Sequence, residues 1–478
     1  MTGREVALTV LRKALRSDAF VSELLDREFK SSALPIEERR LATELAYGCL
    51  RRRGTLDEII ERCSGRSIRE ISPGIDDILR LGVYQLSYLD RVPPYAAVDE
   101  SVKLARRLGP KGSEKFVNAV LRSAQRRRAC PPVVRRGEPS KPTAKKSPAR
   151  SLVVAHSHPL WLVERWLKRW GRDEVEALCC VNNAVPPLVV RVNRLRITRD
   201  ALIAALAREG ARTVPHLGHP FALTIENLPC PLSDLDSFRN GLFQVQDVSG
   251  MRIADLLGAQ PYEKIADLCA GPGGKATAIA EAMGDDGELV CLELRKKKAD
   301  RISENAKRLR LKCIKVVVGD ALKVRSFPGR GLMDRVLVDA PCSNTGVLGK
   351  RPEARWRLKE GDIARLSGLQ MRLLSAAAAF VRPKGVLVYS TCSIEPDENE
   401  GVVERFLEKF PGFEIEDRIE LYPHKSGCDG GYAAKLRPRI HADRRGCEET
   451  VVLSTDYMDC TDLDDAPNDQ EPETRNLS

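Results

Sequence analysis

Near the middle of the chain the sequence reads Ile265-Ala266-Asp267-Leu268-Cys269-Ala270-Gly271-Pro272-Gly273-Gly274-Lys275. Its apolar start predicts a buried strand, and the spacing of apolar residues over 276–283 predicts a helix directly afterwards. The glycines between them allow a tight turn whose backbone amides can approach a ligand at the helix N-terminus. From about Ala259 onward strand and helix patterns alternate, which predicts a doubly wound parallel α/β sheet.

Acidic residues end the next two predicted strands. Glu293 follows the apolar run 288–292, about 20 residues after the turn, where a carboxylate can accept hydrogen bonds from two ribose hydroxyls. Asp320 ends the third strand, where it can hold the exocyclic amine of an adenine ring. A strand, a short glycine loop and acids on the second and third strands recur in methyltransferases, so this pattern favours S-adenosylmethionine (SAM).

The same turn has three other interpretations. A phosphate-binding P-loop is excluded, because the required four-residue loop is absent and Ala276 stands where Ser or Thr is needed. A dinucleotide site remains a formal match through Gly271-x-Gly273-x-x-Ala276. A tight turn with no ligand is the third interpretation, and the ordered acids downstream count against it.

Two cysteines follow predicted strands in short motifs of their own. Cys342 lies in Asp339-Ala340-Pro341-Cys342-Ser343 after the apolar run 335–338, and Cys392 lies in Tyr389-Ser390-Thr391-Cys392-Ser393 after 385–388. Groups just beyond the carboxyl ends of parallel strands line the ligand crevice of an open α/β sheet. One such cysteine is most often an apolar filler. Two in matching positions indicate covalent chemistry.

The chemistry that suits two thiols and a methyl donor is methylation of a pyrimidine. C5 of a pyrimidine is a poor nucleophile until a thiolate adds to C6 and turns the ring into an enamine. The adduct must then lose the C5 proton and expel the thiol. Asp339 could bond the N3/N4 edge of a cytosine and stabilise charge on the ring. The base would have to be unstacked or single-stranded to enter the site.

Length and composition limit the class of protein. The chain has 478 residues, which implies two or three domains, and a formal net charge of +11, which is weak evidence for a polyanionic partner. Its 14 cysteines are not those of a small secreted disulfide framework. There is no signal-peptide pattern and no apolar stretch of about 18 residues. We therefore expect a cytoplasmic protein with reduced thiols, no membrane partner and, without paired Cys/His clusters, no metal.

Periodicity and composition divide the chain into five parts. Residues 1–129 show only helical spacing and predict an all-helical domain. Residues 130–151 are basic and proline-rich and predict a linker. Residues 152–240 predict a small α/β intermediate domain, and 241–455 hold the glycine turn and both cysteine motifs. Residues 456–478 are acidic and poor in apolar residues, so we expect a disordered tail.

These motifs resemble those of the RNA cytosine-C5 methyltransferases, specifically the RsmB (Fmu/Sun) family that acts on bacterial small-subunit (16S) ribosomal RNA. The resemblance runs over most of the chain, and the paired cysteine motifs are highly specific. The matching residues are Cys269–Lys275, Glu293, Asp320, Asp339-Ala340-Pro341-Cys342-Ser343-x-Thr345-Gly346, Arg351-Pro352-x-x-x-Trp356 and Thr391-Cys392-Ser393-x-x-Pro396-x-Glu398-Asn399.

The resemblance implies a role for each matching residue. It makes Cys392 the nucleophile and gives Cys342 a part in product release, and the presence of both motifs selects RNA over DNA. Glu293 is usually an aspartate in this family, but the longer acid still reaches a ribose. The SAM contacts implied are Cys269, Ala270, Gly271, Pro272, Gly273, Gly274, Lys275, Glu293, Asp320 and Asp339.

The N-terminal helices resemble the RNA-binding antitermination factor NusB. The matching stretches are Arg40–Asp57, Pro94–Val102 and Lys115–Leu121. Together the two resemblances imply a Rossmann-like SAM-dependent methyltransferase domain, preceded by an all-helical NusB-like domain and the small intermediate domain. We expect a monomer that methylates C5 of one cytidine in 16S ribosomal RNA. Two rival functions are an RNA-binding regulator with a degenerate catalytic half and a nicotinamide-dependent oxidoreductase.

Overall fold

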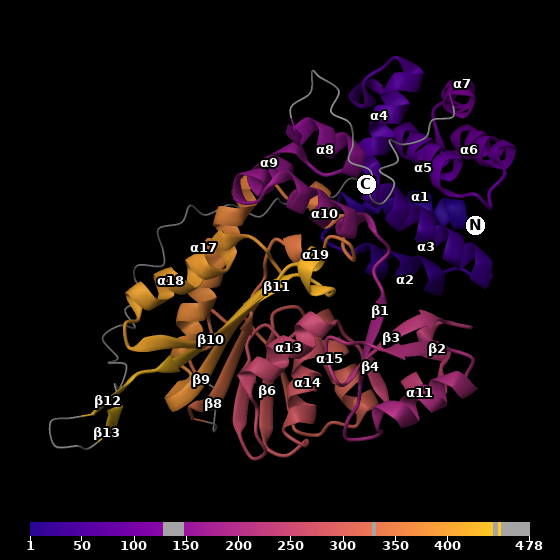
Figure 1. The fold of residues 1–478 in the computed structure, drawn as a ribbon. Coiled ribbons are helices and arrows are strands. Elements are labelled where there is room, and N and C mark those ends of the chain that lie inside the picture. Colours follow the sequence, from indigo (N-terminus) through magenta and orange to yellow (C-terminus); the bar gives the residue numbers. More distant parts are fainter. Residues whose placement is uncertain (128–147, 327–330, 443–447, 451–478) are drawn as a thin grey trace, which may run out of the picture.

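The computed structural model describes residues 1–127, 148–326, 331–442 and 448–450. The predicted acidic tail and all but the last four residues of the predicted basic linker lie outside these ranges. Those four residues begin helix α8 (Pro148–His156). None of the helices in the described part of the chain is long and apolar enough to cross a membrane. Figure 1 shows the helical domain, the intermediate domain and the large α/β domain in contact with one another.

The helical domain is a bundle around one apolar core. Helix α1 begins at a capping box in which Thr2 and Glu5 bond each other's backbone amides, and its Val6 and Val10 are fully buried. In the same domain the buried Arg80 pairs with Asp57, Asp76 and Asp77. The helices are α1 (Gly3–Ala14), α2 (Val21–Lys30), α3 (Ile36–Arg51), α4 (Arg53–Ser64), α5 (Ile75–Tyr88), α6 (Pro94–Leu108) and α7 (Ser113–Arg126).

The intermediate domain combines five helices with a small antiparallel sheet of the order β2-β3-β1-β4. Sequence periodicity predicts β1 and β3 but not β2, an exposed edge strand, or β4, which has three residues and is too short for alternation to be read. The elements are α8, α9 (Leu160–Arg169), α10 (Arg172–Asn183), β1 (Leu188–Val192), α11 (Arg199–Arg208), β2 (Arg212–Pro215), β3 (Ala222–Asn227), α12 (Asp236–Arg239) and β4 (Phe243–Val245).

The large α/β domain contains a seven-stranded sheet with the order β10-β11-β9-β8-β5-β6-β7. The five strands from β9 to β7 are parallel, as predicted, whereas β10 and β11 add an antiparallel pair beside β9, so the sheet is mixed. The strands are β5 (Lys264–Asp267), β6 (Glu288–Glu293), β7 (Ile314–Val318), β8 (Met333–Asp339), β9 (Val381–Thr391), β10 (Phe413–Leu421) and β11 (Gly431–Pro438); β12 (Ile440–Ala442) and β13 (Glu448–Thr450) pair separately.

Helices cover both faces of this sheet, and each face has its own apolar core. Buried residues of α17 (Glu360–Ala378) and α18 (Glu400–Lys409) pack on one face. Those of α13 (Val248–Leu257), α14 (Gly274–Ala282) and α15 (Lys296–Leu309) pack on the other. The chain order reverses between β5 and β8, so the crevice at their carboxyl ends is the topological switch point where open α/β sheets bind ligands.

Candidate active site

The structure brings the two predicted cysteines into contact. Strands β8 and β9 are parallel neighbours in which Asp339 lies opposite Ser390. Cys342 therefore follows β8 at the same edge of the sheet where Cys392 follows β9. Their sulfur atoms are 3.2 Å apart, which is hydrogen-bond distance, and both are free, partly exposed thiols.

A buried carboxylate, Glu398, anchors both cysteine loops. One of its oxygens accepts a hydrogen bond from the Ser343 amide at 2.9 Å. The other accepts from the hydroxyl of Ser393 at 2.5 Å and from the hydroxyl of Ser343. Glu398 is 0% exposed, and burial raises its pKa while the serine hydroxyls oppose that rise. Glu398 belongs to a motif in the sequence, but its role was not predicted, because its partners Ser343 and Ser393 lie in loops 50 residues apart.

The two thiols have pKa values displaced in opposite directions. The hydrogen bond from Cys342 lowers the pKa of Cys392, and the positive charges of Arg351 and Lys275 lower it further against the effect of burial. The same hydrogen bond, together with burial and the charge of Glu398, raises the pKa of Cys342. These shifts favour the thiolate on Cys392 over the thiolate on Cys342, whereas the 3.2 Å contact itself lets either sulfur be the donor.

The glycine turn forms a cradle at the start of α14. Gly273 caps this helix with φ of 101°, a left-handed conformation that favours glycine. The Gly271 amide donates to Glu293 at 3.0 Å, and a Cβ on Gly271 would lie only 2.3 Å from that carboxylate. The second oxygen of Glu293 accepts from the Arg295 amide at 3.0 Å. Glycine at 271 therefore allows the acid on β6 to reach the turn.

Three charged side chains meet at the switch point between β5 and β8. Lys275 forms an ion pair of 2.7 Å with Asp339, whose other oxygen accepts from the Ser390 hydroxyl at 2.9 Å. Burial opposes the charge of Lys275, but Asp339 outweighs it and raises the lysine pKa. Asp267 is 1% exposed, and its Oδ2 has no hydrogen-bond partner. Burial and the charge of Asp339 raise the pKa of Asp267 to about 7.

Asp320 lies on the same edge of the sheet. It follows β7, where Val318 is the register partner of Glu293 on β6. One of its oxygens accepts from the Leu322 amide at 3.0 Å. The predicted acids of the second and third strands are therefore neighbours, next to the glycine turn.

These residues suit an adenosyl cofactor such as SAM. The turn presents helix N-terminal amides, the acids line the adjacent strand ends, and Asp267 offers a buried oxygen that still needs a donor. Asp267 belongs to the quoted turn, yet sequence analysis omits it from the site. The signal was its place as the last residue of β5.

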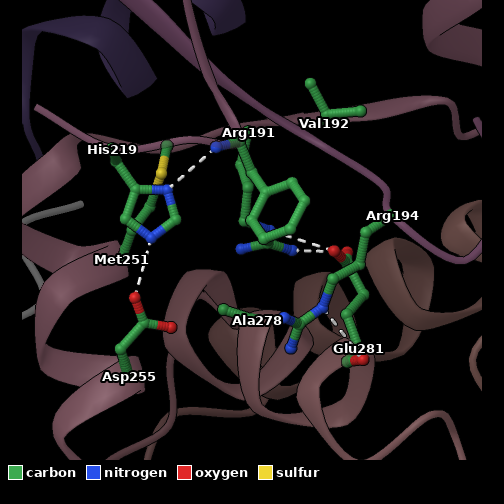
Figure 2. A pocket seen from close by; sticks show the side chains of 9 residues that line it. Arg191, Val192, Arg194, His219, Met251, Asp255, Ala278 and Glu281 are labelled. Carbon is green, nitrogen blue, oxygen red and sulfur yellow. Dashed lines mark hydrogen bonds and ion pairs between the residues drawn. The ribbon is translucent and has the colours of Figure 1, made fainter. Parts of the chain in front are cut away.

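A separate cavity lies between the intermediate and α/β domains (Figure 2). It is closed by a buried ion pair between Arg191 and Glu281 at 2.7 Å, and by His219, which bonds Asp255 at 2.8 Å. Its volume of about 10 Å³ is at the lower limit for one water molecule. Arg191 holds the two domains together, because it pairs with Glu281 and also donates to the Gly274 carbonyl at 3.0 Å.

Comparison with protein families assigns all three domains. The family model described as 16S rRNA methyltransferase RsmB/F matches residues 254–437. The NusB family model matches residues 1–126, and the ferredoxin-like domain of the RsmF/B-like methyltransferases matches residues 158–233. The intermediate domain is therefore ferredoxin-like, and the predicted NusB-like domain is confirmed.

Whole-chain relatives agree with these matches. The probable ribosomal RNA small subunit methyltransferase B of Synechocystis sp. is 36% identical over 91% of this chain and 99% of that protein. The corresponding protein of Bacillus subtilis is 34% identical over 91% and 98%. The crystal structure of PH0851 superposes with a TM-score of 0.77 at 27% identity, covering 91% of this chain and 98% of the other.

The family assignment decides between the interpretations of the glycine turn. The interpretation of the turn as the dinucleotide site of an oxidoreductase is wrong, and the methyltransferase interpretation is confirmed. The domain order, the crevice and the relatives lead to one conclusion. The chain belongs to the RsmB family of SAM-dependent methyltransferases that modify small-subunit ribosomal RNA.

Proposed function

We propose that this protein methylates C5 of a cytidine in 16S ribosomal RNA through a transient bond between Cys392 and C6 of the base. The observation that carries the proposal is the contact of two thiols, 3.2 Å apart, beside the Lys275–Asp339 pair and the glycine turn. A methyltransferase acting on an exocyclic amine or a ribose hydroxyl has no need of two such thiols.

Cys392 begins the reaction as the thiolate. Its sulfur adds to C6 of cytosine, and the electrons displaced from the C5–C6 double bond make C5 nucleophilic. SAM, when bound, supplies an electrophilic methyl group that C5 can attack. The lowered pKa of Cys392 increases the thiolate fraction near neutral pH, where a cysteine of ordinary pKa is mostly protonated.

Asp339 and Lys275 act on the base rather than on the methyl group. Asp339 is assigned to the N3/N4 edge of cytosine, where hydrogen bonds stabilise charge that develops as the thiolate adds. Lys275 holds Asp339 from one side at 2.7 Å and Ser390 holds it from the other at 2.9 Å. The carboxylate is therefore oriented before the base arrives.

Release of the product is assigned to Cys342. After methylation the C5 proton passes to water, the C6–S bond breaks, and its electrons return to Cys392. The Cys342 thiol lies within hydrogen-bond distance of that sulfur and can stabilise it as it leaves. Its raised pKa keeps the donated proton on Cys342.

The cofactor site is assigned to the turn and the acids around it. Residues 269–275 would lie against the methionine part of SAM, while Glu293 would take the ribose hydroxyls and Asp320 the adenine amine. Asp339 would border both the cofactor and the base. The alignment of these residues along four adjacent parallel strands supports the assignment.

A methylation assay with mapped products tests the proposal. Purified protein, SAM and 16S ribosomal RNA that lacks the modification should yield one new 5-methylcytidine, located by bisulfite sequencing. Because contacts between the protein and RNA phosphates weaken with salt, the rate of methyl transfer should fall steeply as the salt concentration rises. Methylation on another base, or on an exocyclic nitrogen, would overturn it. Absence of all methyl transfer would instead favour the RNA-binding regulator.

A further inference from the structure

Residues 349–357, here called the docking segment, connect the Cys342 loop to the rest of the α/β domain and pack against the helical domain. Arg355 in this segment is 0% exposed and donates only to oxygens of uncharged groups, including the Asn182 carbonyl at 2.9 Å. The Trp356 indole donates to the Leu50 carbonyl at 2.7 Å. The helical domain is thus attached within a few residues of the active site.

The turn between α1 and α2, with the helix ends beside it, makes a second set of contacts with the docking segment. Arg357 donates to the carbonyl oxygens of Ala14 and Ala19, each at 2.6 Å. The Val21 amide donates to the buried Glu353 at 3.0 Å. These bonds fix the backbone on both sides of Phe20 relative to the docking segment.

Phe20 lies against Arg351 of this segment, which also bonds the Cys342 loop. The guanidinium carbon of Arg351 is 4.1 Å from the centre of the Phe20 ring, which is close cation–π contact. Arg351 also donates to Oδ1 of Asn344. When it is protonated, the Cys392 thiol donates a hydrogen bond to the same oxygen at 3.4 Å. A side chain of the helical domain is therefore linked to Cys392 through two residues.

The charges that face Cys392 come from separate elements. Besides the thiol of Cys342, they are Asp339 at the end of β8, Lys275 of α14 and Arg351 of the docking segment. Arg351 itself faces the buried carboxyl group of Glu353 and the partly exposed carboxyl group of Asp429. Lys275 is held by its ion pair with Asp339, whereas Arg351 has Asn344 and the Phe20 ring.

We propose that Phe20 is a positioning residue for the methyltransferase reaction: its ring holds the guanidinium of Arg351 beside Cys392. The inference deepens the proposed function and rests on it for the role of Cys392. An arginine side chain has many rotamers, and stacking on a fixed ring restricts them. The helical domain then completes the catalytic site in addition to any contact it makes with RNA.

Alkylation of Cys392 in the RNA-free, full-length protein tests this proposal. Iodoacetamide labelling across pH, followed by mass spectrometry of the Cys392 peptide, reports the thiolate directly. Phe20→Leu should slow labelling at pH 7 by about threefold to tenfold, the range expected when a partly buried cation–π contact is lost. Phe20→Leu should also move the midpoint of the curve of labelling rate against pH to higher pH. Phe20→Tyr keeps an aromatic face and should restore both.

Two further comparisons separate positioning from loss of packing. In an Arg351→Gln background, Phe20→Leu should have no additional effect, because Phe20 acts through Arg351. Phe29→Leu is the matched control, since that ring lies 5.6 Å from Arg39 within the helical domain, and it should leave labelling unchanged. SAM affinity, measured by calorimetry, should stay within about twofold of the wild-type value in Phe20→Leu, Phe20→Tyr and Arg351→Gln.

Defined results would overturn the proposal. The first is an unchanged rate of Cys392 labelling in Phe20→Leu. The others are that Phe20→Leu slows labelling as much in the Arg351→Gln background as it does alone, or that Phe29→Leu slows labelling as much as Phe20→Leu does. The assay requires no methyl transfer, so it can fail while Cys392 still proves to be the nucleophile. Conversely, loss of the cytidine product would overturn the proposed function without changing the labelling result.

Discussion

The loops after β8 and β9 are built alike but lie in different electrostatic surroundings. Each begins at a parallel strand end and continues with cysteine and serine, and each serine is bonded to Glu398. Cys392, however, faces the positive charges of Arg351 and Lys275 as well as the negative charge of Asp339, whereas Cys342 faces only the negative charge of Glu398 among the charged groups that shift its pKa. A common anchor brings the two sulfurs together, and the hydrogen bond between them, together with charges that are not shared, lowers the pKa of Cys392 and raises that of Cys342.

This comparison has a chemical consequence for a reaction in which a thiol attacks and later leaves. An attacking thiolate needs nearby positive charge, while a group that stabilises its departure must keep a proton to donate. Two cysteines in identical surroundings would compete for one proton. The asymmetric charges favour the proton on Cys342 before substrate binds.

The largest expected effect comes from removing the thiolate member of the pair. Cys392→Ala should lower methyl transfer by at least about 10³-fold, because no other group can form the bond to C6. SAM affinity measured by calorimetry should not change. Cys180→Ala, at an exposed cysteine in α10, is the control and should remain active. Normal turnover by Cys392→Ala would refute the assignment of the two loops.

Removing the other member should stop the reaction at a later step. Cys342→Ala should still form the bond to C6 but release the product poorly, so a protein–RNA adduct should survive a denaturing gel. The double variant lacking both thiols should form none. If Cys342→Ala turned over normally without an adduct, the two loops would not have the separate roles proposed.

Disturbing the shared anchor should affect both loops moderately. Glu398→Gln replaces an acceptor oxygen by a donor, which leaves a hydrogen of Ser343, Ser393 or Gln370 unpaired in the interior. We expect the free energy of unfolding to fall by about 2 kcal/mol, measured by denaturant titration. We also expect about tenfold slower turnover. Glu404→Gln, at an exposed position of α18, should change neither.

The smallest expected effect is a change in pH dependence. Because the pKa of Cys392 lies below its ordinary value in the folded protein, its labelling by iodoacetamide should persist to lower pH than that of a free cysteine. Labelling should decline as the pH falls through that pKa. Cys342→Ala removes the donated hydrogen bond, so the midpoint should move up and the rate at pH 7 should fall severalfold. A midpoint that moved down would reverse the assignment of donor and acceptor.

Much of the site can be predicted from sequence because its signals are local. The glycine turn, the acids at 293 and 320 and both cysteine motifs each follow an apolar strand run, and parallel strands end at one edge of a sheet. Strands β2 and β4 and the antiparallel pair β10–β11 escaped prediction. The residues of β2 are exposed at an edge, β4 has too few residues, and the β10–β11 pair is mixed in polarity. Pairing with neighbouring strands, rather than a pattern within the strand, therefore determines these elements.

The sequence alone determined the domain order, the SAM-type turn and the choice of two cysteines, because these depend on patterns within short stretches of chain. Only the tertiary structure decided which cysteine has the lowered pKa, which carboxylate anchors both loops, and that Phe20 of the helical domain stacks on Arg351. Electrostatic potential at a sulfur is a sum over charges brought together from distant elements. No local pattern of residues contains that sum.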